Sequence, residues 1–217
     1  KLTHEKVFAW AEKHAGDIKS KKEHINRIIP PAMIPFEKIT KRGLTQSHVA
    51  IGRQSYAIEN PNRLAFFMLI NLLGGPSMNS LLNVSVRERH GLVYSIEANF
   101  TSYMDAGFWA IYFGTEPNQV AKSIRLIHKE FNKLKDRELS ASALVKIKSQ
   151  LKGQMAMAEE SNLNFMLMMA KNLLDREKIE TLEELFEQIE LVTAGQLQSL
   201  ATDMLNPDQL SCLIFEP

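Results

Sequence analysis

The spacing of hydrophobic residues at the start of the chain predicts one helix followed by a linker. Apolar side chains recur at helical intervals within residues 3–15, between Thr3 as the N-cap and Gly16 as the stop. From Asp17 to Pro35, basic residues and prolines follow one another without a sustained period, which indicates a linker that crosses a surface.

Two further helices are predicted before the middle of the chain. Asn60, as the N-cap, and Pro61, as the first helical residue, open a helix that Gly74-Gly75-Pro76 ends. A second helix is expected from about Met78 to Arg89 and is stopped by Gly91.

Apolar runs with the period of a strand predict a sheet. The runs are residues 36–41, 47–53, 92–101, 106–114 and 210–215. In the third run alternation places Tyr94 on the same face as Ile96, as in a half-buried strand. The fourth run is apolar on both faces, which favours a central strand, and the short 102–105 connection makes the third and fourth runs a hairpin.

The chain between the last two runs is helical for about 90 residues, with amphipathic stripes. Thr181 with Glu184, and Thr193 with Gln196, are typical of capping boxes that open two of these helices. A cluster of methionines, five of them between residues 155 and 169, is expected to be adaptable core, although an exposed peptide groove would use the same residues. The order of elements predicts an α+β domain with helices packed on one face of a mainly antiparallel sheet.

Composition excludes several classes of protein. The chain has 217 residues, and 26 basic against 25 acidic side chains give a formal charge of +1, which argues against a basic nucleic-acid-binding face. Hydrophobic residues make up 45%, as in ordinary globular proteins of one or two domains. No run reaches the roughly 18 apolar residues of a membrane span. The chain opens on Lys1 rather than Met, so we expect a processed or cut portion of something larger.

The sequence offers little for metal binding or nucleophilic catalysis. The histidines are scattered, without the three- or four-residue spacing that puts two ligands on one helix face. They are His4, His14, His24, His48, His90 and His128. Cys212, the single cysteine, lies in an apolar run and is expected to be a buried structural thiol. Gly74 and Gly75 lack the Gly-Lys-Ser/Thr ending of a phosphate loop, so we expect them to be a helix stop.

One segment, residues 86–95, could carry chemistry. Arg87 at a helix end and Tyr94 at a strand start can point into one cleft, where a fixed cation and a phenolic hydroxyl would hold a peptide carbonyl or a developing oxyanion. On spacing alone, Arg87 could equally be a surface salt-bridge partner and Tyr94 a core ring with a solvated tip.

Several short motifs in register resemble the pitrilysin family of zinc metallopeptidases, which includes insulin-degrading enzyme and the mitochondrial processing peptidases. The motifs are Leu72-Leu73-Gly74-Gly75, Met78-Asn79-Ser80, Val86-Arg87-Glu88-Arg89-His90-Gly91-Leu92-Val93-Tyr94-Ser95, Asp105-Ala106-Gly107-Phe108, Ile111-Tyr112-Phe113-Gly114-Thr115, residues 139–153 and Val192-Thr193-Ala194. The resemblance covers nearly the whole chain.

The resemblance implies a domain organisation and a zinc site elsewhere. In this family a zinc-bearing domain with a His-x-x-Glu-His motif precedes a related metal-free domain, and this chain, which lacks the motif, resembles the second one. Residues 1–16 would be the closing helix of the missing zinc domain, 17–35 the linker and 36–217 the C-terminal peptidase-family domain. Zinc is expected in the missing domain or in a partner, and no cofactor is expected in this chain.

The resemblance also implies partners and a role for the Arg–Tyr pair. Two halves of such an enzyme close around a peptide or an unfolded polypeptide, so a zinc-bearing domain or subunit and a dimer of full-length chains are expected. Arg87 and Tyr94 match an Arg and a Tyr seven positions apart that would contact the substrate carbonyl or the tetrahedral intermediate in trans to zinc. The isolated chain is expected to be inactive.

One departure from the family, and alternatives to an enzymatic role, remain open. Many relatives carry an Arg where this chain has Leu81, so a contact made by that cation does not carry over to this chain. The chain could instead be a non-catalytic paired subunit, like the core proteins of a respiratory complex, or an unrelated α+β binding module. The short-subunit style of the motif favours a soluble bacterial protein of the cytoplasm or the periplasm.

Overall fold

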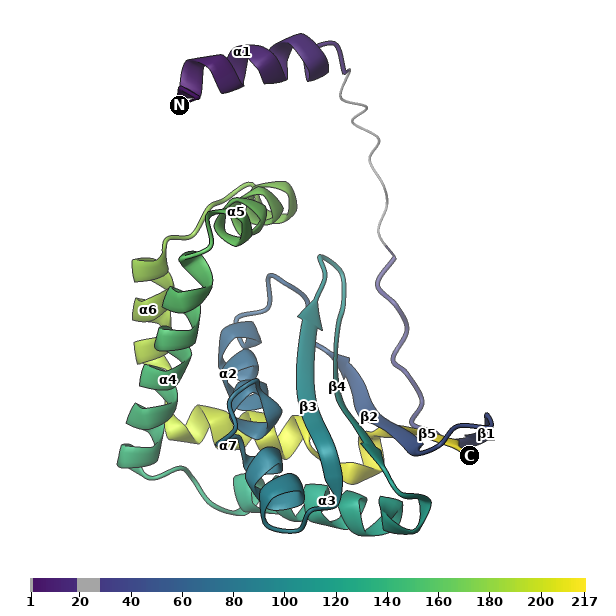
Figure 1. Cartoon of the computed structure of the whole chain (residues 1–217). Helices are drawn as coiled ribbons and strands as arrows, with labels where there is room; N and C mark the ends of the chain where they lie inside the picture. Colours follow the sequence, from purple (N-terminus) through teal and green to yellow (C-terminus); the bar gives the residue numbers. More distant parts are fainter. Residues whose placement is uncertain (1, 19–27) are drawn as a thin grey trace.

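The structure, a computed structural model, describes residues 2–18 and 28–217 and has the expected α+β architecture. Five strands form one sheet in the order β1-β5-β2-β4-β3 (Figure 1). They are β1 (Glu37–Lys41), β2 (Ser47–Ser55), β3 (Val93–Ser102), β4 (Gly107–Thr115) and β5 (Ser211–Glu216). All neighbours are antiparallel except β1 and β5, so the prediction of a mainly antiparallel sheet is confirmed.

The helices follow the predicted order. They are α1 (His4–Ala15), α2 (Arg63–Gly74), the π-helical segment η1 (Asn83–Glu88), the 3-10 turn η2 (Pro117–Gln119), α3 (Val120–Asp136), α4 (Ala141–Glu159), α5 (Asn162–Arg176), α6 (Leu182–Leu191), α7 (Ala194–Met204) and the 3-10 turn η3 (Pro207–Gln209). Helix α1 has Thr3 as N-cap and Gly16 as C-cap, as predicted, and it buries none of its residues. Part of the predicted linker, residues 19–27, lies outside the described residues.

Helices cover one face of the sheet, and the described residues leave the other face open (Figure 1). Along β4, Trp109, Ile111 and Phe113 are buried against the helices, whereas Phe108 and Tyr112 on the opposite face are 47% and 43% exposed. The prediction that β4 lies inside the sheet is therefore confirmed, but only one of its apolar faces is covered. Apolar side chains on the open face of a sheet commonly mark a surface that meets something else.

Helix α2 begins two residues later than the sequence predicts. Asn60 is not the N-cap: its side-chain oxygen accepts a hydrogen bond from the backbone N–H of Asn62, at 2.9 Å, and closes a short turn. Asn62 then takes the N-cap position. Asparagine favours such local turns as readily as it caps helices, so the residue type alone does not separate the two uses.

The other end of α2 packs closely on the sheet. A Cβ atom added at Gly74 would lie 2.8 Å from both the backbone nitrogen and the Cβ atom of Ala98 on β3. Only a glycine permits this approach, and the backbone N–H of Gly75 donates to the carbonyl of Asn71 at the helix end. The prediction that the glycine pair stops a helix is confirmed, and the first glycine also sets how closely α2 approaches β3.

The methionine-rich region departs from its expected place in the core. Leu151 of α4 is buried and Met155 is partly buried, but Met157 is 64% exposed and Met166 of α5 is 56% exposed. None of the residues of α5 is buried. The prediction that these methionines form core is therefore wrong for α5, because the described residues do not supply a second surface to cover that helix.

Candidate functional site

Residues 83–92 form an unusual turn that joins helix to strand. The backbone N–H of Arg89 donates to the carbonyl of Val84, five residues earlier, at 3.1 Å. The predicted α-helix over 78–89 is therefore wrong in its start and in its type, because helical geometry begins only at residue 81 and Asn83–Glu88 is a π-helical turn. The N–H of Leu92 then bonds to the carbonyl of Val86, also at 3.1 Å, across Gly91, whose φ of +60° is left-handed. π turns widen a helix by one residue and often occur at functional sites.

The start of β3 carries a β-bulge that the alternation of the sequence does not reveal. Val93 pairs with Thr115 and Ile96 with Phe113, so Tyr94 and Ser95 together oppose the single residue Gly114. In a bulge the extra residue breaks the alternation of faces and re-aims a side chain. Tyr94 is accordingly 88% exposed instead of sharing the buried face of Ile96, and the predicted alternation is wrong at this residue.

Arg87 in the π turn and Tyr94 in the bulge lie in one short segment and are both accessible. The Arg87 side chain is 35% exposed, and its Nε atom lies 3.7 Å from Oε1 of Glu88. The hydrogen bond from Leu92 to Val86 links the residue beside Arg87 to the start of the strand that carries Tyr94. The sequence left open that Tyr94 is a core ring and that Arg87 is a surface salt-bridge partner. The exposure of Tyr94 excludes the first alternative. The ion pair between Arg87 and Glu88 is present, but its distance of 3.7 Å is long.

The open face of the sheet beside the bulge carries a pair that sequence reasoning missed. His48 on β2 pairs with Gly114, so it lies in the same transverse row as Tyr94 and Ser95. Its Nδ1 atom lies 2.7 Å from the hydroxyl oxygen of Tyr112. Glycine at 114 leaves no side chain between the bulge and His48. Only the strand register brings these residues together, so spacing along the chain gave no signal.

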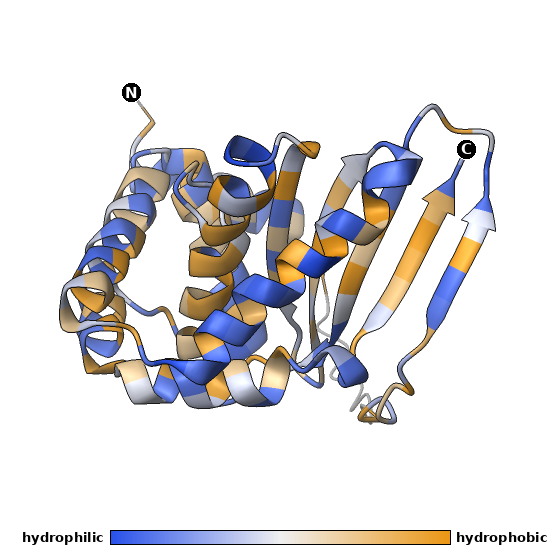
Figure 2. Cartoon of the chain, turned by 90° about the horizontal axis from the view of Figure 1, so that it is seen from below, coloured by the Kyte–Doolittle hydropathy of each residue, from blue (hydrophilic) through white to orange (hydrophobic). Residues whose placement is uncertain are grey.

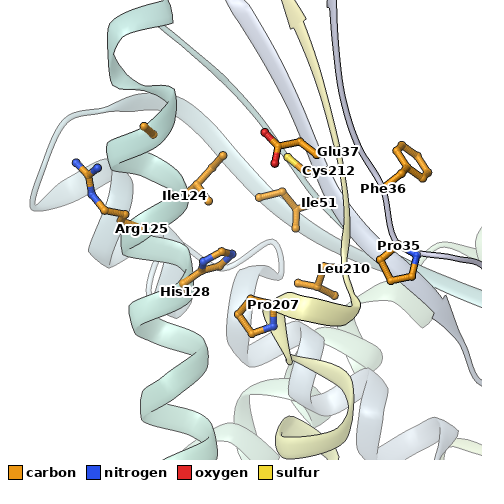
Figure 3. A pocket seen from close by; sticks show the side chains of 11 residues that line it. Pro35, Phe36, Glu37, Ile51, Ile124, Arg125, His128, Pro207, Leu210 and Cys212 are labelled. Atoms are coloured by element: carbon orange, nitrogen blue, oxygen red, sulfur yellow. The ribbon is translucent and has the colours of Figure 1, made fainter.

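A cavity lies on the helix side of the sheet, away from this row (Figure 3). It has a volume of about 460 Å³ and lies between α3, β5 and the segment before β1. In Figure 3, Ile124 and His128 of α3 point toward Ile51 and Leu210. Burial, with a smaller contribution from Lys135, lowers the pKa of His128 and so favours its neutral form. The wall is mostly apolar and offers no pair of groups set for acid–base chemistry.

Cys212, which also lines this cavity, is not an activated nucleophile. Burial, and to a lesser degree the charge of Glu37, raises the pKa of its thiol to about 11. Reactive cysteines have lowered pKa values in electropositive surroundings. The thiol is half-buried rather than fully buried, but the expectation of an unreactive structural residue agrees with its surroundings.

The described residues do not fit a zinc ion. Within residues 2–18 and 28–217, no group of three His, Cys, Asp or Glu side chains is placed to hold a metal. His48 has a tyrosine beside it rather than a second ligand, and His128 has apolar neighbours. Within the same ranges, no helix is long and apolar enough to cross a membrane.

Comparison with known proteins gives the family. Residues 1–151 match the family described as the peptidase M16 inactive domain, which is well over half of the chain. The chain belongs to this family. The resemblance to the zinc metallopeptidases of the pitrilysin type is thereby confirmed.

Curated relatives of this M16 inactive domain are named as zinc proteases and processing peptidases. It is 32% identical over 179 residues to "Uncharacterized zinc protease YmxG" of Bacillus subtilis, covering 82% of this chain and 44% of that protein. It is 23% identical over 211 residues to mitochondrial-processing peptidase subunit beta of Saccharomyces cerevisiae, covering 90% and 46%. The chain thus spans about half the length of the curated relatives it matches.

Solved structures confirm the fold. A protease from Helicobacter pylori superposes with a TM-score of 0.84 at 21% identity, covering 100% of this chain and 53% of that one. A chain of complex III2 from Candida albicans gives a TM-score of 0.80 at 17% identity, covering 99% and 53%.

Proposed function

We propose that this M16 inactive domain is the metal-free half of a zinc peptidase and that it contributes Arg87 and Tyr94 to the binding of a peptide substrate. The observation that carries the proposal is the combination of a π turn and a β-bulge in one short segment, which leaves both side chains accessible. Both features depart from regular geometry, and such departures concentrate at functional sites.

The chemistry of the pair suits an oxygen that gains negative charge. A guanidinium donates several N–H groups in a fixed fork and a phenol donates one O–H, so together they can hold a peptide carbonyl and stabilise the tetrahedral oxygen that forms from it. Zinc chemistry would be supplied by the other half, and no step of it is assigned to residues of this chain. This division agrees with the relatives, which are named zinc proteases although the family matched here is an inactive domain.

The remaining parts of the chain fit the same division. Residues 36–217 would form the metal-free domain, residues 17–35 the linker and α1 the closing helix of a zinc-bearing unit. The open face of the sheet, with Phe108, Tyr112 and His48, would form half of the wall around the peptide. We call this chain together with its zinc-bearing domain or subunit the assembled enzyme.

Two substitutions in the assembled enzyme test the role of the pair. We expect Arg87→Ala and Tyr94→Phe each to lower kcat by roughly tenfold to a thousandfold, because each removes a donor to the transition state. Arg89→Ala is the matched control, since Arg89 follows on the same turn and is exposed. Steady-state peptide hydrolysis gives the rates, and circular dichroism checks that each variant folds.

An unchanged rate in both variants would contradict the proposal. The chain would then be the paired subunit that supports assembly without contacting the reacting bond. Equal losses in Arg89→Ala would likewise count against a specific role for Arg87.

A further inference from the structure

Helix α5 carries two stripes of side chains, and only one of them faces the rest of the domain. The inner stripe contains Phe165, Met168 and Met169, and the first two line a cavity of about 220 Å³ shared with α4 and α6. The outer stripe recurs at helical intervals of three and four residues and is apolar throughout. Its members, which we call the outer stripe of α5, are Leu163, Met166, Leu167, Ala170, Leu173 and Leu174.

The outer stripe is exposed along its whole length. Leu174 is 84% exposed, and Leu163, Met166, Leu167 and Leu173 are between 52% and 61% exposed. No charged residue occurs in the first nine positions of α5, from Asn162 to Ala170. A helix that is apolar on all sides is normally buried, because only then does its apolar surface leave water. The stripe is thus a surface that is completed by another molecule or another domain.

The base of the helix is fixed to the domain, so the stripe is held in place. Arg176 donates from Nε to Oε1 of Glu59 at 3.0 Å, and its Nη1 is bonded to Glu180. Burial by itself raises the pKa of the Glu180 carboxyl, but the hydrogen bonds from Arg176 and Gln188 and the charge of Arg176 hold it below its usual value. A partner that binds the outer stripe would therefore bind a helix that is already formed and fixed in position.

We propose that the outer stripe of α5 packs against the zinc-bearing half of the assembled enzyme. This inference rests on the function proposed above and assigns the contact surface for its partner. The curated relatives contain about as much chain again beyond their matched portion, enough for a second unit of this size. The stripe lacks the charges of a transient partner surface, and obligate interfaces are the apolar ones.

Other occupants fit the surface less well. Helices that lie on membranes carry Lys and Arg beside their apolar face, whereas Lys171 is the only charged residue before Asp175 in α5. A peptide substrate would suit the methionines, but it would leave the stripe bare between turnovers. A second copy of this chain would not account for the further length of chain in the curated relatives.

Methionine oxidation tests the proposal without a substitution. Met166 on the stripe is 56% exposed and Met33, before β1, is 50% exposed, so the two should react with hydrogen peroxide at similar rates in this chain alone. In the assembled enzyme we expect Met166 to slow by at least about fivefold relative to Met33, because a packed thioether is shielded from the oxidant. Peptide mass spectrometry measures both rates in one sample, and buried Met68 gives the lower limit.

Each alternative gives a different result. An unchanged Met166 rate in the assembled enzyme overturns the proposal. Protection that appears in this chain alone at high concentration indicates a second copy, and protection that appears only on adding peptide indicates a substrate groove; both also overturn it.

A pair of surface substitutions provides a second test. Leu174→Lys changes a side chain that is 84% exposed, and Leu191→Lys on α6 is the control because Leu191 is 78% exposed. We expect Leu174→Lys to weaken association of the two halves by tenfold or more, or to restore the oxidation of Met166, while Leu191→Lys does neither. If Arg87→Ala lowers turnover but Leu174→Lys changes neither the association of the two halves nor the oxidation of Met166, the proposed function is retained and this interface is rejected.

Discussion

At the scale of single residues, burial distinguishes the polar side chains that can reach a ligand from those that are chemically inert. Tyr94 and Arg87 are accessible because the backbone turns them outward, whereas Cys212 and His128 are held in their neutral forms by their surroundings. The sequence identified Arg87 and Tyr94 as a pair, but it did not identify His48, which only the pairing of β2 with β4 places in their row.

The thiol of Cys212 gives a residue-scale prediction with a defined pH dependence. Its pKa of about 11 in the folded chain lies above the ordinary value of 9.0, so the fold favours the protonated form. Between these two values the unfolded thiol is ionised and the folded one is not. We expect alkylation of the folded chain at pH 8 to be roughly 100-fold slower than in the unfolded chain and to keep rising with pH up to about 11.

Iodoacetamide labelling followed by mass spectrometry measures this rate, and the single cysteine makes the readout unambiguous. A folded-state rate that levels off near pH 9 would contradict the raised pKa.

At the scale of elements, the sequence predicted those features that depend only on neighbouring residues, such as helix caps. Thr181 and Glu184 form the complete capping box that their spacing predicted, and the hydroxyl of Thr193 accepts from the backbone N–H of Gln196. The bulge in β3 and the delayed start of α2 were missed because each depends on a partner distant in the sequence or on a competing turn. The exposed α5 was missed because hydrophobic spacing shows that a face is to be buried, but not what buries it.

At this scale we predict that alanine substitutions at two helical glycines change the free energy of unfolding in opposite directions. Gly153 lies inside α4, and a methyl group added there would have nothing within 4 Å, so Gly153→Ala is expected to stabilise the fold by about 0.5–1 kcal/mol through helix propensity. Gly74→Ala is expected to destabilise it by roughly 1–3 kcal/mol, because the added methyl group would meet β3 at 2.8 Å.

Urea unfolding followed by circular dichroism gives both changes in the free energy of unfolding. Equal effects of the two substitutions would show that α2 can move away from β3 without cost.

At the scale of the whole molecule, the sequence predicted the fold class and the family, because many short patterns agreed in register. The helix layer does not extend over the whole sheet: β1 is the outer strand next to β5 and stands clear of the helices (Figure 2). Ile39 on β1 pairs with buried Ile214, yet it is 54% exposed. Together with the open sheet face and α5, this edge makes the domain one part of a larger assembly in our proposal.

The whole-molecule prediction is that this chain alone does not hydrolyse peptides. The described residues offer no metal site, and Arg87 and Tyr94 can stabilise an oxyanion but cannot generate a nucleophile. We expect no turnover above the uncatalysed rate by the purified chain with added zinc, measured with a fluorogenic peptide library. Sustained hydrolysis that a chelator abolishes would contradict this prediction.

The bulge at Tyr94 and Ser95 has a consequence for how the domain can change during evolution. Two residues share one partner there, so the bulge absorbs an offset of one position between the helix end and the strand. The segment from Arg87 to Tyr94 can therefore keep its seven-position spacing while Ile96 and Ala98 keep their places in the core. Residues before the bulge and residues after it can then change independently of each other, and sequence alignments of related domains should run without gaps from Arg87 to Tyr94.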